Sequence, residues 1–164
     1  MASSQPIIRQ VKLLSLIPQL FFLGLIINIY FLLGINDALL YGLLTYLIIS
    51  IIVRNIIPFY HRRGIKLYKY NKYNKYEKAI IEFEKSYHFF EKHKWIDRYR
   101  YIVLLSPSRI SYLEMAMINM AFCYGQIGNG KKSKELYEKA LEMFPESQMA
   151  KVALKMFESA KQIE

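Results

Sequence analysis

The sequence predicts an all-α protein in which an N-terminal two-helix transmembrane hairpin precedes a short helical domain. Two observations lead to this prediction. The 164 residues are 54% hydrophobic yet include 23 Lys and Arg, and the charges are segregated: residues 61–164 hold nearly all of them, while residues 1–60 hold only Arg9, Lys12, Asp37 and Arg54. From residue 64 onward, apolar residues recur at helical spacing and strand-like alternation is absent.

The first predicted span covers about residues 13–34. No charged side chain occurs between Lys12 and Asp37, and the residues between them are apolar on all sides, unlike an amphipathic soluble helix. A helix of this length matches the bilayer hydrocarbon, which is roughly 30 Å thick. Gln19 and Asn28 are the only amides well inside it, and we expect them to hydrogen-bond between the helices of the hairpin.

The second predicted span covers about residues 38–59, after a short turn at residues 34–37. Its uncharged run ends before Arg54, which is short for a span, but Arg54 can extend its side chain toward the interface. A re-entrant segment that does not cross fully is the alternative. The hairpin as a domain is therefore expected over residues 1–60.

Basic residues flank both spans on the same side of the membrane. Arg9 and Lys12 precede the first span, and the loop between the spans holds only Asp37. The basic residues at or beyond the end of the second span are Arg54, His61, Arg62, Arg63, Lys66 and Lys69. The positive-inside rule then predicts an integral membrane protein with both termini in the cytoplasm. The lone Cys123 fits a reducing compartment, and its apolar neighbours predict a buried structural thiol.

Residues 112–145 predict an antiparallel helix pair. Ser111 and Glu114 form a capping box before the first helix, Gly128 separates the two helices, and Pro145 ends the second. The segment resembles a tetratricopeptide repeat, a 34-residue helix–turn–helix unit. The residues that match its signature are Ala121, Tyr124, Gly128, Tyr137, Ala140 and Pro145, with Ser133 where alanine is usual.

A degenerate copy of the same unit is expected over about residues 60–92. Ala79 and Phe83 match the signature, whereas Glu91 stands at the proline position, and a first helix over 60–73 does not fit the standard spacing. Residues 95–107 predict an inserted helix, and residues 147–164 a capping helix such as ends many repeat arrays. The resemblance covers about residues 64–164, and the whole chain also resembles bacterial membrane proteins that carry such repeats, which implies the bacterial cytoplasmic membrane.

The resemblance implies a protein-binding scaffold whose inner surface comes from the first helix of each pair. The expected partner-binding residues are Met115, Ile118, Asn119, Phe122 and Gln126. Asn119 is similar in position to the asparagine with which family members hold a peptide backbone or carboxylate. The alternative is that Asn119 is a solvated polar residue. The expected ligand is a short helix or an extended peptide.

A basic stretch follows the second span. Residues 61–79 carry seven Lys and Arg against one acidic residue, Glu77. Anionic headgroups are the nearest partner for such a cluster, and nucleic acid is disfavoured by the position beside the membrane. The expected headgroup contacts are Arg62, Arg63, Lys66, Lys69 and Lys72.

The sequence shows no motif for catalysis. It has no phosphate-binding glycine loop and no His or Cys spacing typical of a metal site, so we expect no catalytic residue, no cofactor and no metal. The predicted function is a membrane-tethered scaffold that binds a partner protein or peptide. The alternative is an integral accessory subunit held in a membrane complex through the hairpin.

Overall fold

The computed structural model describes residues 15–69 and 73–161. Every regular element in these ranges is a helix, which confirms the predicted all-α class. The helices form two compact units: one comprises Met1–Ile57 with Arg98–Ile110, and the other comprises Pro58–Asp97 with Ser111–Glu164. The chain therefore crosses between the units three times.

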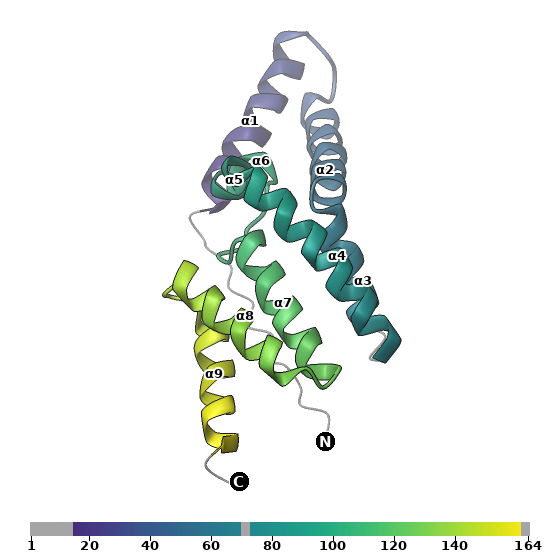
Figure 1. Cartoon of the computed structure of the whole chain (residues 1–164). Coiled ribbons are helices and arrows are strands. Elements are labelled where there is room, and N and C mark those ends of the chain that lie inside the picture. The colour runs from purple at the N-terminus through teal and green to yellow at the C-terminus, as the bar shows by residue number, and fades with distance from the viewer. Residues whose placement is uncertain (1–14, 70–72, 162–164) are drawn as a thin grey trace. The chain divides into compact units, whose positions relative to one another are not determined.

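The first unit is built on two apolar helices, α1 (Leu16–Leu32) and α2 (Ala38–Ile56), which run antiparallel and pack together (Figure 1). The turn between them contains two residues in the left-handed backbone conformation, Gly34 with φ of 68° and Asp37 with φ of 61°. Glycine adopts this conformation at no steric cost, and aspartate tolerates it better than most residues. The turn thus forms where the sequence predicted it.

The contact between α1 and α2 depends on a glycine and a hydrogen bond. A Cβ at Gly42 would lie 2.5 Å from the Ile27 side chain, so the helices approach this closely only because position 42 has no side chain. The Tyr30 hydroxyl and the Thr45 hydroxyl are 2.9 Å apart and hydrogen-bonded. Small residues and side-chain hydrogen bonds are how helices associate where solvent is apolar.

Among the described residues, α2 is the one helix long and apolar enough to cross a membrane, with 19 residues, while α1 is a shorter apolar helix of 17. The helices end at Leu32 and Ile56, short of the predicted ends at residues 34 and 59, and residues 13 and 14 lie outside the described residues. Pro58 accounts for the second difference. It has no N–H to donate to the preceding turn, so α2 stops and a new helix begins after it.

The segment after residue 94 differs most from the expected single helix over 95–107. It forms two short helices, α5 (Lys94–Arg98) and α6 (Arg100–Val103), followed by an irregular stretch. α6 contacts α1, and Leu104 and Leu105 are buried. Residues 98–110 therefore belong to the first unit and not to the C-terminal domain. An apolar run in the sequence predicts that the segment is buried, but it does not predict which helices the segment packs against.

The second unit consists of stacked helix pairs. α3 (Phe59–Tyr68) packs on α4 (Tyr73–Lys92), and α7 (Tyr112–Gln126) packs on α8 (Gly130–Met143). α4 also packs on α7, and α9 (Gln148–Lys161) packs on α8 (Figure 1). Each pair thus buries its apolar side against its neighbour in chain order.

The residues that carry the repeat resemblance occupy the tightest parts of this unit. The fully buried ones are Ala79, Phe83, Ala121 and Ala140. Tyr137 is also buried, and Ser133, at the alanine position, is only 1% exposed, so its hydroxyl fits the space. Tyr124 is half-buried, Gly128 has a φ of 82° in the turn between α7 and α8, and Pro145 is exposed just beyond α8.

Gly64 is a close-approach residue that the sequence analysis did not identify. A Cβ there would lie 2.6 Å from the Phe83 ring, so α3 and α4 pack at this distance only with glycine. Gly64 precedes Phe83 by 19 positions, whereas Ala121 precedes Tyr137 by 16. The longer connection between α3 and α4 explains why the standard repeat spacing did not locate the first helix.

Two side chains cap the N-terminus of α7. The Ser111 hydroxyl accepts a hydrogen bond from the Glu114 N–H at 3.1 Å, as the capping box predicted. The buried Asp97 carboxylate accepts two more, from the N–H groups of Tyr112 at 2.8 Å and Leu113 at 2.9 Å. A carboxylate at a helix N-terminus satisfies free N–H groups and complements the helix dipole. Asp97 thereby fixes the point where the chain re-enters the second unit.

Candidate functional site

Four cations gather on one side of α3. We name Arg62, Arg63, Lys66 and Lys69 the basic face; all four are exposed, and Lys72 lies outside the described residues. At about 100° per residue they fall within an arc of roughly 120°. The opposite side of α3 carries His61 and Gly64, which are buried. Lys69 directly follows Tyr68, the last residue of α3, so the basic face extends to the C-terminal end of the helix.

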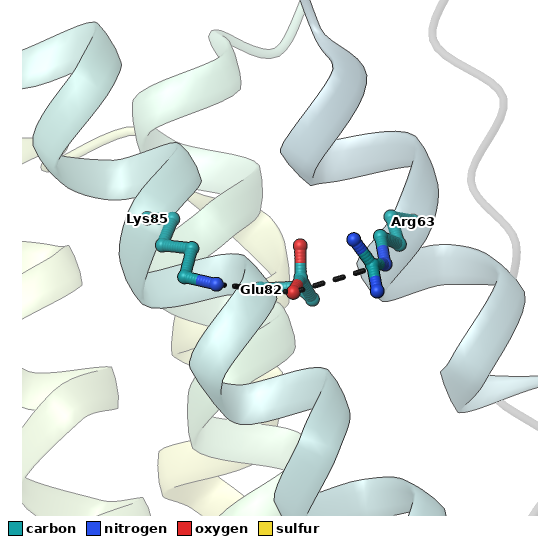
Figure 2. Close-up of polar contacts among 3 residues, drawn as sticks. All are labelled: Arg63, Glu82 and Lys85. Atoms are coloured by element: carbon teal, nitrogen blue, oxygen red, sulfur yellow. Dashed lines mark hydrogen bonds and ion pairs between the residues drawn. The ribbon is translucent and has the colours of Figure 1, made fainter.

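Glu82 of α4 pairs with Arg63, at one edge of the basic face. Its Oε1 lies 3.8 Å from Arg63 Nε and 3.3 Å from Lys85 Nζ (Figure 2). The Glu82 side chain is 8% exposed, and its Oε2 has no hydrogen-bond partner among the described residues, whereas the Arg63 side chain is 58% exposed. Taking a carboxylate out of water is costly unless cations or hydrogen-bond donors lie close to it. Arg63 and Lys85 keep enough exposed surface to meet a second anion.

His61 does not contribute to the positive flank that the sequence predicted. It is buried, its ring packs 5.5 Å from the Phe83 ring and 5.3 Å from the Tyr112 ring, and its Nδ1 has no hydrogen-bond partner in the part of the chain that the structure describes. This burial lowers the pKa of His61 from 6.5 to about 4. The imidazole is therefore neutral at pH 7.

The five predicted partner-binding residues lie along α7 and differ in exposure. Gln126 is exposed, Met115 and Asn119 are partly exposed, and Ile118 is only 4% exposed. Ile118 therefore belongs to the packed interior and offers almost no surface. Asn119 and Gln126 are seven positions apart, which places them on one side of the helix two turns from each other.

Phe122, the fifth predicted residue, is part of an aromatic cluster. Its ring centre lies 5.4 Å from that of Tyr68 and 6.4 Å from that of Tyr76, and the Tyr68 and Tyr76 rings are 6.2 Å apart. All three contacts are edge-to-face, the favourable geometry for aromatic pairs. The cluster joins α3, α4 and α7. Tyr68 and Tyr76, which are interspersed with the basic residues in sequence, are therefore engaged in packing and not displayed for base stacking.

A polar contact in the first unit links three segments. Arg54 of α2 donates a hydrogen bond to Gln19 Oε1 of α1 at 3.5 Å and another to the carbonyl oxygen of Leu105. Leu105, whose carbonyl oxygen accepts this hydrogen bond, has a left-handed backbone with φ of 48°. The expected helix-to-helix hydrogen bond of Gln19 is thus present. Arg54 reaches into the unit instead of extending away from it.

Asn28, for which the sequence predicted the same kind of bond, is exposed on α1. It makes no hydrogen bond within residues 15–69 or 73–161. The other amide on these helices, Asn55, is satisfied locally because its side chain donates to the Ile51 carbonyl oxygen at 2.6 Å. Asn28 is therefore an open hydrogen-bonding group on an apolar surface.

Cys123 is a structural thiol. It is fully buried in α7, and burial raises the pKa of its thiol to about 12. A nucleophilic cysteine needs the opposite shift, because the thiolate is the reactive form. Cys123 is therefore protonated and unreactive at pH 7, as its apolar neighbours predicted.

Neither protein-family models, curated proteins nor solved structures give a match to this chain. The arrangement of its own residues is therefore the basis for assigning a function.

Proposed function

We propose that this protein is a membrane-tethered helical-repeat scaffold that binds a partner protein or peptide at the cytoplasmic membrane surface. The observation that carries the proposal is the stacking of α3/α4 on α7/α8 with Ala79, Ala121 and Ala140 fully buried between helices. Small residues at these positions are what a tetratricopeptide-like array requires for close packing. Such arrays present a surface for other proteins.

The apolar surface of the first unit supports the tether. Along α1 and α2, large hydrophobic side chains are exposed on nearly every turn, among them Leu20, Phe31, Leu39 and Ile48. In water such a surface would associate or aggregate, whereas in a bilayer it meets hydrocarbon. We therefore place both helices in the membrane as a hairpin, with the chain entering the cytoplasm after α2.

The position of the basic face in the chain supports its role at the lipid surface. Arg62 follows Ile56, the last residue of α2, by six positions, so the backbone limits their separation to roughly 20 Å. Each Lys or Arg close to an anionic surface contributes about 1 kcal/mol of attraction. Lipid headgroups are thus the anions that the basic face reaches first. Packing of Tyr68 and Tyr76 argues against nucleic acid, which needs free aromatic rings for stacking.

The partner surface is best assigned to the Asn119–Gln126 side of α7. Asn119 offers a donor and an acceptor to a peptide backbone, and Gln126 extends the polar surface two turns along the helix. Met115 supplies an adaptable apolar contact between partner and helix. Ile118 supports this surface from inside and is not expected to touch the partner, whereas Phe122 is partly exposed and packs against Tyr68 and Tyr76.

Photocrosslinking in native membranes tests this assignment. With benzoylphenylalanine at Gln126 we expect a defined adduct that Asn119→Ala reduces at least several-fold. Benzoylphenylalanine at the exposed Gln148 of α9 is the matched control and is expected to give no such adduct. The proposal is wrong if both positions give the same adducts or if Asn119→Ala leaves the adduct unchanged. An adduct formed only from α1 or α2 would favour the accessory-subunit alternative.

A further inference from the structure

The outward side of α1 carries a seam of five residues spaced four, three, four and three apart. We name it the α1 seam: Ile17, Phe21, Gly24, Asn28 and Phe31. All five are exposed, with Phe21 at 74% and Phe31 at 73%. This spacing keeps residues on one line of a helix that wraps around another helix at a small crossing angle.

The opposite side of α1 is already occupied. Gln19 and Ile26 are buried there, and the Phe22 ring packs 6.3 Å from the Tyr46 ring of α2. Tyr30 on the same side holds Thr45 through its hydroxyl. The α1 seam therefore faces away from α2 and is open to another helix.

Two members distinguish the seam from the apolar surface around it. A Cβ built at Gly24 has no atom within 4 Å, so this glycine serves no close approach inside the chain, in contrast to Gly42. Asn28 lies one turn further on and has no hydrogen-bond partner in the described ranges. An amide left unsatisfied in hydrocarbon is costly, so its position beside a glycine marks a helix-to-helix contact.

We propose that the α1 seam pairs with the same seam of a second copy of this chain, giving a parallel dimer within the membrane. An asparagine amide carries both a donor and an acceptor, so two Asn28 side chains related by a two-fold axis satisfy each other. Gly24 allows the two backbones to approach one turn away. This pairing rests on the membrane placement of α1 proposed above.

The identity of the occupant follows from self-complementarity. A single asparagine in an otherwise apolar seam fixes the register of two helices, because any shift separates the two amides. Phe21 and Phe31 lie on either side of the Gly24–Asn28 contact and would bury apolar area against their copies. A lipid chain offers Asn28 no partner, and a helix of a different protein would have to place a hydrogen-bonding side chain at the same depth, whereas a second copy has one there already.

Cysteine crosslinking of the full-length chain in native membranes tests the pairing. The native Cys123 is buried and does not interfere. Phe21→Cys and Phe31→Cys lie on the seam, while Leu25→Cys and Ile29→Cys are exposed on another side of the same helix and serve as matched controls. After mild oxidation we expect disulfide-linked dimers from the two seam positions and several-fold less from the two control positions.

Second substitutions then test the two diagnostic residues. In the Phe21→Cys background, Asn28→Leu is expected to weaken association by roughly 3- to 30-fold, the range for one interhelical hydrogen bond in a bilayer, and to lower the dimer yield accordingly. Gly24→Leu is expected to lower it as well, because the helices can no longer approach. Asn55→Leu, which removes the locally satisfied amide of α2, is the control and is expected to leave the yield unchanged.

Carbonate extraction of the same membranes separates the two proposals. If the protein stays in the membrane but all four cysteine positions crosslink equally or not at all, the pairing is wrong while the tether stands. A seam crosslink to a protein of different mass, with no dimer, also rules out a second copy as the occupant. Release of the protein by carbonate would overturn the tether and the pairing together.

Discussion

His61 connects the packing of the second unit to pH. Its imidazole is buried against Phe83 and Tyr112, and its pKa is about 4 in the folded protein against about 6.5 in an unfolded chain. Between these two values the unfolded state binds a proton that the folded state does not. The free energy of unfolding therefore has its full value above pH 6.5. It decreases as the pH falls from 6.5 to 4, by about 3 kcal/mol in total.

We accordingly predict that acidification from pH 7 to pH 4 destabilises the second unit and that His61→Leu removes most of this dependence. Hydrogen exchange of the α3 and α4 amides in nanodiscs is the measurement. His88→Leu is the matched control, since His88 is an exposed histidine on α4. An unchanged pH dependence in His61→Leu would assign the effect to other groups.

Gly64 of α3 has no room for a methyl group. The Gly64→Ala variant places its Cβ against the Phe83 ring at a distance that cannot persist, so α3 must shift from α4. We expect a loss of about 1–3 kcal/mol in unfolding free energy, typical of overpacking. Thermal unfolding in detergent, followed by circular dichroism, measures it.

Gly130→Ala is the control for that variant. Its Cβ would meet Phe157 at 3.9 Å, an ordinary contact, so alanine there is expected to be neutral or slightly stabilising. Equal effects of the two substitutions would show that helix propensity, and not the contact with Phe83, governs Gly64→Ala.

At the scale of elements, α7 depends on a carboxylate from another helix. Asp97→Ala leaves the N–H groups of Tyr112 and Leu113 without their acceptor, and we expect it to cost about 1–3 kcal/mol. Ser111→Ala, which removes one bond at the same helix end, is expected to cost about 1 kcal/mol. Chemical unfolding of both variants in detergent gives the comparison; a smaller effect for Asp97→Ala than for Ser111→Ala would contradict it.

The basic face of α3 gives an element-scale prediction about lipid. In nanodiscs that contain anionic lipid, the α3 amides are expected to exchange more slowly than in nanodiscs of neutral lipid. Arg62→Glu with Lys66→Glu should abolish the difference, since about 1 kcal/mol of attraction is lost per charge and repulsion replaces it. High salt should weaken the effect in the parent protein.

The control for this experiment reverses charges elsewhere in the second unit. Lys151→Glu with Lys155→Glu changes the net charge by the same amount on the exposed side of α9. If this variant loses the lipid dependence equally, net charge and not the basic face is responsible. Arg63 is left unchanged because its ion pair with Glu82 also joins α3 to α4.

The sequence predicted those helices whose residues carry local signals. Ser111, Glu114 and Gly128 bound α7 and its turn in the chain itself, and the structure places the helix between them. The small residues Ala121 and Ala140 could be located because they stand at the small-residue positions of the repeat that this segment resembles. Helical class, the turn at Gly34 and the buried thiol of Cys123 followed from the same local chemistry.

What the sequence did not predict depends on contacts distant in the chain. The cap from Asp97 acts across fifteen positions, and the contact of Gly64 with Phe83 spans a connection of non-standard length. From the sequence, His61 is assigned to the basic flank of the second span. Its burial against Phe83 and Tyr112 could not be predicted, because both residues are distant in the chain. For the predicted binding surface, helical spacing alone could not show that Ile118 is buried or that Phe122 packs against Tyr68 and Tyr76.

For the molecule as a whole, the three crossings between the units make the second unit discontinuous in sequence. A fragment covering residues 58–164 would retain residues 98–110 without the rest of the first unit, which includes the helix that α6 contacts, α1. Such a fragment is expected to aggregate. Aggregation of this fragment would therefore result from residues 98–110, which lack the rest of their unit, and would say nothing about the partner-binding surface.

The Asp97 cap shows how a water-soluble version can be made instead. Because the Asp97 carboxylate already touches the N–H groups of Tyr112 and Leu113, the two ends of the insertion lie side by side, and a linker of about three residues can replace residues 98–110. A chain of residues 58–97 and 111–164 joined in this way is expected to elute as a monomer in size-exclusion chromatography, whereas the continuous fragment is not. Residues 98–110 could then be removed or exchanged without disturbing the helices of the second unit.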